Sequence, residues 1–191
     1  ATTDLTGFQE VLEAHGPTDF VGRHQNEATG TVLAVLAIEG TDDVAIVLDR
    51  TPFYAESGGQ VGDTGTIETD TGRAAVLDTD YGVPEVHRHR ARIVEGGITP
   101  GQEARAAIDG QRRDAIRRNH TATHILHWAL REVLGDHVRQ QGSLVAPERL
   151  RFDFSHFEPV TAEQIARIED LANHDILANP PVRHFETSKA E

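Results

Sequence analysis

The hydrophobic pattern of this chain changes near residue 111, and that change constrains the fold more than any other feature. Before residue 111, short apolar runs alternate with Gly, Asp, Thr and Pro, as in "TGTVLAVLAIEG", "DDVAIVLDR" and "VHRHRARIV". Short strands separated by turn residues at this spacing are typical of a small antiparallel barrel or sandwich. The sequence therefore predicts a β-barrel over residues 20–110, after an N-terminal lead-in over residues 1–19.

A helical pattern replaces the strand pattern after residue 111. It predicts a long helix over about residues 111–134, two strands in "VRQQGSLVAP" and "RLRFDFSH", and a helix in "PVTAEQIARIEDLANHDILAN". Thr161 and Gln164 fit a capping box at the start of the last helix, and "PPVRHFETS" is a candidate final strand. The expected fold class is α+β, a small antiparallel β-barrel followed by an α/β core over residues 111–191.

Charge is unevenly distributed along the chain. The net charge is −13, from 31 acidic and 18 basic residues, and this balance argues against nucleic-acid binding by the chain as a whole. Residues 111–151 nevertheless contain eight arginines against four acids. Lys189 is the only lysine, and this arginine bias either suits phosphate recognition or reflects biased genomic composition.

The chain contains no cysteine and no methionine. Without cysteine, it can form neither disulfides nor thiolate metal sites of its own. It has no apolar run of about 18 residues and no basic-then-apolar leader, so we expect a cytoplasmic protein. The missing methionine and the abrupt ends indicate an internal piece of a longer protein, although removal of an initiator methionine before Ala1 explains the start equally well.

Three histidines, His120, His124 and His127, lie within two turns of the long helix in "RNHTATHILHWAL". At about 100° per residue they share one face, away from the apolar stripe of the helix. Three arginines fall on the same face: Arg113, Arg117 and Arg131. His120 and His124, four residues apart, can bridge a zinc ion, and the arginines can bind anions. The alternative is a solvated polar face.

A second polar segment is "LDRTPFYAESGGQVGDTG", residues 48–65. Its glycines, with Gly58 and Gly59 adjacent, allow positive φ angles and close approach of the backbone to a ligand. Thr51 and Gln60 belong to the polar groups that crowd around them. A Gly-Gly pair in a β-rich region is also typical of a plain turn or bulge, so both interpretations stay open.

Three motifs together resemble the alanyl-tRNA synthetase family of the bacterial type, in the segment with the β-barrel and the first part of the editing domain. They are "DRTPFYAESGGQVGDTG", "RNHTATHILHWALREVLG" and "QQGSLVAPERLRFDFSH", in the family's order and spacing. That family binds zinc through His-x-x-x-His and a downstream Cys-x-x-x-His. The resemblance implies His120 and His124 as zinc ligands, with the second pair outside this chain. It gives His127 no ligand role, and His156 is a less favoured local alternative.

The resemblance implies a fragment of an alanine-tRNA ligase. The whole enzyme would attach alanine to tRNA(Ala) with ATP and Mg2+, which this region would not bind. This region would serve zinc-assisted editing, the hydrolysis of mischarged Ser-tRNA(Ala) and Gly-tRNA(Ala). The implied partners are the acceptor end of tRNA(Ala) and the remainder of the synthetase chain.

The resemblance also suggests roles for particular side chains. Thr51 would recognise the hydroxyl of a serine substrate, and Gln60 with the Gly58–Gly59 loop would approach the terminal ribose. The three arginines, Arg113, Arg117 and Arg131, would contact phosphates of the acceptor end. Two alternatives remain: a stand-alone deacylase acting in trans, and a catalytically inactive tRNA-binding module without metal.

Overall fold

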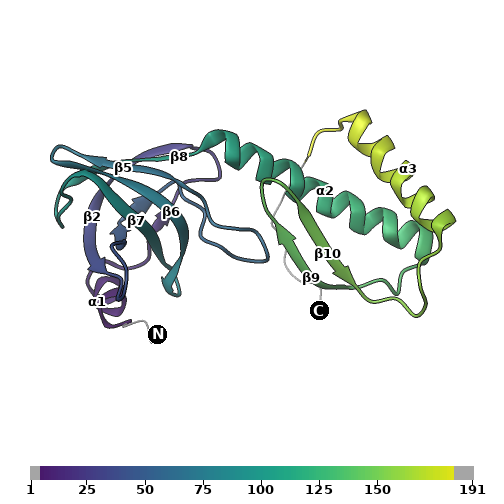
Figure 1. The fold of residues 1–191 in the computed structure, drawn as a ribbon, viewed down its shortest axis with the longest axis horizontal. Helices are drawn as coiled ribbons and strands as arrows, with labels where there is room; N and C mark the ends of the chain where they lie inside the picture. The colour runs from purple at the N-terminus through teal and green to yellow at the C-terminus, as the bar shows by residue number, and fades with distance from the viewer. Residues whose placement is uncertain (1–4, 183–191) are drawn as a thin grey trace. The chain divides into compact units, whose positions relative to one another are not determined.

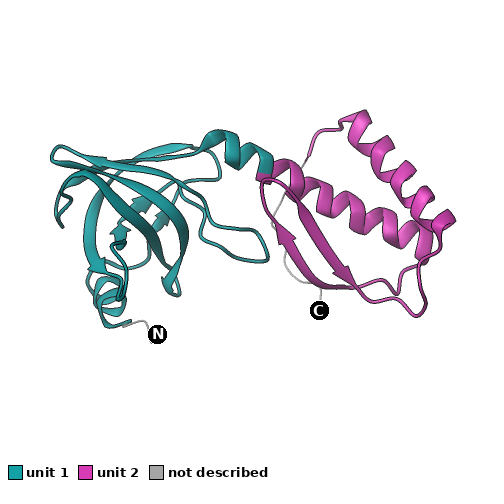
Figure 2. Cartoon of the chain, viewed as in Figure 1, with its two compact units in different colours: residues 1–115 teal, residues 116–191 magenta. Residues whose placement is uncertain are grey.

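The computed structural model describes residues 5–182, which form three helices and ten strands (Figure 1). The chain divides into two compact units, residues 1–115 and 116–191 (Figure 2). The first unit contains most of the strands, and the second is mainly helical. Among residues 5–182, no helix is long and apolar enough to cross a membrane.

Six antiparallel strands of the first unit close into a barrel in the order β2-β3-β7-β6-β5-β8. They are β2 (Glu27–Ala37), β3 (Val44–Leu48), β5 (Gly65–Thr69), β6 (Gly72–Val83), β7 (Val86–Gly96) and β8 (Glu103–Ile108). Closure is made by β8, which pairs with β5 and with β2. The predicted antiparallel β-barrel is confirmed.

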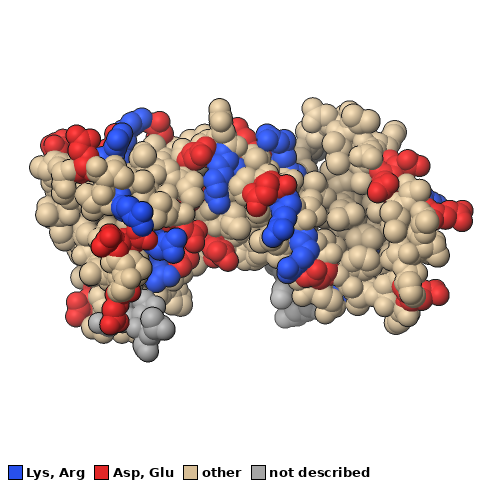
Figure 3. All heavy atoms as spheres, viewed as in Figure 1, with Lys and Arg blue, Asp and Glu red and all other residues tan. Residues whose placement is uncertain are grey.

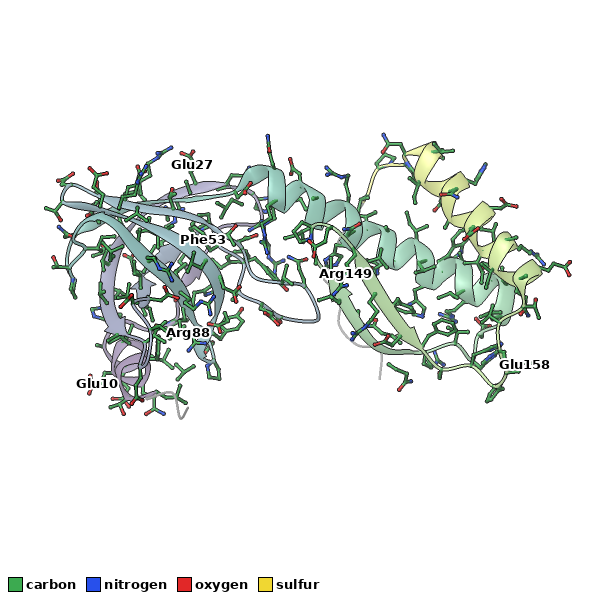
Figure 4. All side chains as sticks on the ribbon, in the orientation of Figure 1. Glu10, Glu27, Phe53, Arg88, Arg149 and Glu158 are labelled. Atoms are coloured by element: carbon green, nitrogen blue, oxygen red, sulfur yellow. The ribbon has the colours of Figure 1, made fainter. Side chains whose placement is uncertain are left out.

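Side chains that alternate along the strands fill the barrel core. Val32, Ile46, Leu48 and Ile67 are at most 1% exposed, and they share one cluster with Phe53 from the loop after β4 (Figure 4). Burying an aliphatic or aromatic side chain of this size stabilises a fold by about 1.5–3 kcal/mol. The strand-period pattern of the sequence therefore accounts for both the barrel and its core.

Helix α1 (Thr6–His15) lies where the sequence predicted only a lead-in. Its Phe8 and Val11 are buried in a second apolar cluster, which includes Val47 of β3 and Val86 of β7. Leu5 precedes the helix and makes no side-chain capping bond. The helix depends on packing against the barrel.

Two short strands, β1 (Asp19–Phe20) and β4 (Arg50–Thr51), form a separate parallel pair in the first unit. Phe20 lies opposite Thr51 in this pair. The residues that follow β4 form the glycine-containing loop, so this pair fixes where that loop begins.

Helix α2 (Gly110–Leu134) begins directly after β8 and continues into the second unit. That unit adds the hairpin of β9 (Gln140–Val145) and β10 (Leu150–Phe154), and helix α3 (Ala162–Ala178). Its core joins Leu130 of α2, Phe152 of β10 and Ile168 of α3. The two predicted helices of this region and the two predicted strands between them are confirmed.

The predicted capping box of α3 is also confirmed. Gln164 donates its backbone N–H to Thr161 Oγ1 at 3.2 Å, and Thr161 donates its backbone N–H to Gln164 Oε1 at 2.9 Å. The candidate strand in residues 180–188 finds no support in residues 180–182, which are not in a strand. Its remaining residues lie outside the described part of the chain.

Candidate functional site

The glycine pair lies at the tip of a small hairpin, residues 54–63. Ser57 N–H donates to Gln60 O at 3.2 Å, and Gln60 N–H donates to Ser57 O at 3.0 Å. Between them, Gly58 and Gly59 have φ angles of 60° and 86°, as the two central residues of a type I′ turn require. The amides of Ser57 and Gln60 are thus paired within the turn. Glu56, Ser57 and Gly58 are exposed at the tip, whereas the Gln60 side chain is buried.

Arg113 lies at the base of this hairpin, and its predicted place on an exposed arginine ridge is wrong. The side chain is only 5% exposed. Its Nε donates to the Asp63 carboxylate at 2.9 Å and 3.0 Å, its Nη1 to the Gly22 carbonyl at 2.7 Å, and its Nη2 to the Pro52 carbonyl at 3.1 Å. Helix periodicity takes no account of the loops of the first unit, and groups of Gly22, Pro52 and Asp63 in these loops enclose the Arg113 side chain.

Thr51, which the resemblance assigns to the substrate hydroxyl, is fully buried. Its Oγ1 lies 2.7 Å from Nε2 of His89, and Nδ1 of His89 lies 2.8 Å from the Ile46 carbonyl oxygen. Because a carbonyl only accepts, His89 carries its proton on Nδ1, and Nε2 accepts the hydroxyl proton of Thr51. Thr51 Oγ1 also accepts the Phe53 N–H at 3.2 Å. The Thr51 hydroxyl therefore bonds within the first unit and is not exposed to solvent.

His87 and His89 are two buried histidines that the sequence interpretation did not single out. Burial disfavours the charged form and lowers the pKa of each from 6.5 to about 4. His87 stacks on Phe20, and its Nδ1 has no hydrogen-bond partner among the described residues. The alternation in "VHRHRARIV" was the available signal, because it places both histidines on the same face of β7 as the buried Ala91.

His120 and His124 lie one helical turn apart on α2, as predicted. Their ring centroids are 5.2 Å apart, the rings are tilted by 33°, and both residues are exposed. Partial burial of the His120 ring, and then the neighbouring His124, lower the pKa of His120. The lowered pKa favours the neutral imidazole that metals bind. Residues 5–182 contain no group of three or more His, Asp or Glu side chains that could hold a metal ion. Two imidazoles one helical turn apart can supply two of the four ligands that a tetrahedral zinc site requires.

The other two histidines considered as ligands have different neighbours. The His127 ring packs against Phe152 with centroids 5.0 Å apart. His156 Nδ1 lies 2.8 Å from His137 Nε2, so these two imidazoles share a hydrogen bond. A cavity of about 320 Å³ adjoins the histidine face of α2 in the second unit, and its lining residues are His124, His127, Trp128, Arg131, Glu132 and Asp136.

Two of the three predicted ridge arginines keep some exposure. Arg117 is exposed, and the Arg131 side chain is 39% exposed with Nη2 bonded to Asp136 Oδ1 at 2.6 Å. Figure 3 shows arginine atoms interspersed with acidic atoms on the face in view, and Figure 4 labels Arg149 near the turn of the β9–β10 hairpin. The other exposed arginines near α2 and this hairpin are Arg118, Arg139, Arg149 and Arg151.

Comparison with known proteins identifies the family. Residues 3–112 match the family described as tRNA synthetases class II (A), and the chain belongs to this family. It is 48% identical over 190 residues to the alanine-tRNA ligase of Rhizobium meliloti, covering 95% of this chain and 21% of the relative. It is 50% identical over 183 residues to that of Thermus thermophilus, covering 92% of this chain and 20% of the relative. The predicted resemblance to alanyl-tRNA synthetases is confirmed, and the chain spans about a fifth of the length of these relatives.

Proposed function

We propose that this chain is part of an alanine-tRNA ligase that attaches alanine to tRNA(Ala) with ATP in the cytoplasm. The observation that carries this proposal is the identity of about half of all aligned positions along more than nine tenths of the chain. ATP and Mg2+ would bind elsewhere in the longer enzyme. The partners would be tRNA(Ala) and the remainder of the synthetase chain.

We further propose that this region serves editing, the hydrolysis of tRNA(Ala) charged with serine or glycine. A pocket shaped for the methyl group of alanine cannot exclude glycine by size, and an apolar pocket rejects an added hydroxyl only about a hundredfold. A second, hydrolytic site supplies the missing discrimination. His120 and His124 support this role, because they present two imidazoles at the spacing of metal ligands.

The residues of this chain would contribute binding and positioning. His120 and His124 would hold a zinc ion together with two ligands from outside these 191 residues, the Cys-x-x-x-His that the family resemblance implies. When bound, zinc would polarise the ester carbonyl or lower the pKa of a water molecule. Arg117 and Arg131 would contact phosphates of the acceptor end, and the exposed Gly58–Gly59 tip would meet the terminal ribose, with the buried Gln60 supporting that tip. The burial of Thr51 favours a supporting role for that residue.

Hydrolysis of serine-charged tRNA(Ala) tests the editing proposal. We expect the longer protein, which includes the downstream Cys-x-x-x-His, to hydrolyse the ester, and His124→Ala to abolish that activity. The 191-residue chain alone should not hydrolyse it. Deacylation by the 191-residue chain at the rate of the longer protein would contradict a site divided in this way. Alanylation of tRNA(Ala) with ATP by the longer protein would distinguish a ligase from a stand-alone deacylase.

Zinc binding by the 191-residue chain gives an independent measurement. Two imidazoles leave at least two coordination positions to water, so titration calorimetry should detect only weak binding, which His124→Ala removes. His156→Ala should have no effect, because that imidazole bonds to His137. Tight stoichiometric binding that His156→Ala abolishes would show that the ligand set is misassigned.

A further inference from the structure

Arg113 gathers three separate loop segments of the first unit around one guanidinium group. The acceptors are the Gly22 carbonyl after β1, the Pro52 carbonyl after β4, and the Asp63 carboxylate at the end of the hairpin. Nε and both Nη atoms all donate, and the side chains of Arg113 and Asp63 are 5% and 2% exposed. A lysine ammonium lacks the planar fork that serves these three directions at once.

Asp63 joins the two ends of the glycine hairpin. Its Oδ2 accepts the Tyr54 N–H at 2.8 Å, and its own N–H donates to the Tyr54 carbonyl at 3.0 Å. Its carbonyl accepts the Thr79 hydroxyl at 2.9 Å, which ties the same end to β6. One carboxylate therefore meets Arg113 on one side and the first residue of the hairpin on the other.

Two further contacts hold the hairpin near its base. Arg112 Nη1 donates to the Gly62 carbonyl at 2.7 Å, and Glu56 N–H donates to the Thr79 carbonyl at 2.8 Å. A Cβ atom at Gly62 would collide with the Thr79 carbonyl oxygen, so the backbone is packed too closely there for any other residue. Beyond this base, the backbone of Ser57 at the exposed tip bonds to Gln60 and to the Tyr54 hydroxyl, both within the hairpin.

We propose that Arg113 is a positioning residue for the glycine tip, which consists of Ser57, Gly58 and Gly59. Its ion pair with Asp63 fixes the position of these three residues. The proposal rests on the proposed function only for what the tip does, namely contact with the end of a charged tRNA. Arg113 itself touches no substrate. It acts through Asp63, and Asp63 acts through the base of the hairpin.

Amide hydrogen exchange in the 191-residue chain tests the positioning role without any substrate. In Arg113→Lys, the hydrogen-bonded amides of Glu56, Ser57 and Gln60 should exchange at least tenfold faster, whereas the amides of β3 keep their rates. The matched control is Arg92→Lys, which weakens an Arg–Asp pair with Asp43 elsewhere on the barrel. It should leave the three hairpin amides unchanged.

Two outcomes would overturn the proposal. One is unchanged exchange at the three hairpin amides in Arg113→Lys. The other is a uniform acceleration over hairpin and barrel alike, which would show that the pair only contributes global stability. If Arg113→Lys does not fold, Asp63→Asn replaces it, because that change keeps the side-chain shape and removes the charge that Arg113 faces.

Kinetics of the longer protein then connect the tip to editing. Arg113→Lys should lower kcat for hydrolysis of serine-charged tRNA(Ala) at least tenfold with little change in KM, and leave alanylation unaffected. An unchanged kcat beside a loosened hairpin would overturn the positioning role in the reaction. A wild-type protein without any hydrolysis would instead refute the proposed function, and the exchange measurement would still decide whether Arg113 positions the tip.

Discussion

At the residue scale, the hydrogen bond between Thr51 and His89 shows how a polar pair is accommodated inside the barrel. Thr51→Val keeps the side-chain volume and leaves the buried His89 Nε2 without its donor. An unsatisfied buried polar group costs about 1–3 kcal/mol, so the free energy of unfolding should fall by that amount. Urea unfolding measures it. Thr29→Val, on an exposed position of β2, is the control and should change stability little.

A change below a few tenths of a kcal/mol in Thr51→Val would contradict the assigned proton position. So would a loss of serine specificity without any loss of stability, because that result would return Thr51 to direct contact with the substrate.

The two buried histidines of β7, His87 and His89, should make the free energy of unfolding depend on pH. Their pKa in the folded chain is about 4, against 6.5 in an unfolded chain, so the unfolded state binds more protons between these values. Stability should therefore be complete above pH 6.5 and fall as the pH drops toward 4. Near pH 5, each such histidine contributes a slope of about 1 kcal/mol per pH unit.

His87→Phe isolates one of these two contributions. Phenylalanine can keep the ring contact with Phe20 and has no proton to bind. Unfolding free energies measured in urea from pH 7 to pH 5 should show a slope smaller by about 1 kcal/mol per pH unit. An unchanged slope would mean that His87 is hydrated and titrates normally in the folded chain.

At the scale of elements, α2 carries two kinds of arginine. Arg113 in the first turn is buried and paired, whereas Arg117 one turn later is exposed. If the exposed arginines contact phosphates, Arg117→Gln should weaken tRNA(Ala) binding and reduce the slope of log K against log salt by about one. Fluorescence anisotropy at several salt concentrations measures both quantities. Arg92→Gln on the barrel should change neither, and equal slopes in the two variants would favour a solvated polar face on α2.

The elements with strong local signals were predictable from the sequence. The barrel strands alternate with period two, and α3 begins at a capping box that local residues complete. Helix α1 was not predictable because Leu5 at its N-cap makes no side-chain capping bond and its apolar residues pack on the barrel. The local sequence pattern cannot predict the packing of α1 against the barrel, because the barrel residues that it contacts are distant in sequence.

Some features of the candidate site were likewise predictable from the sequence, and others were not. The spacing of His120 and His124 follows from helix geometry alone, so their proximity was predictable. The burial of Arg113 was not, because its acceptors at residues 22, 52 and 63 come from loops far away in sequence. Thr51 likewise bonds to a histidine 38 positions away. Side chains whose role depends on long-range partners require the structure.

At the scale of the whole molecule, we propose that this region of the longer protein hydrolyses mischarged tRNA(Ala). The glycine hairpin belongs to residues 1–115, and the histidine pair belongs to residues 116–191. The family relatives are about five times longer than this chain, and the zinc ligands and the ATP site that we propose in addition to His120 and His124 would lie in that further sequence.

Comparison of two hydrolysis rates is the decisive test of the editing proposal. The longer protein should be incubated separately with serine-charged and alanine-charged tRNA(Ala), without ATP, and the release of each amino acid measured. We expect the serine ester to be hydrolysed much faster than the alanine ester, and His124→Ala to remove the difference. Equal rates on the two esters in the unmutated protein would contradict the editing assignment.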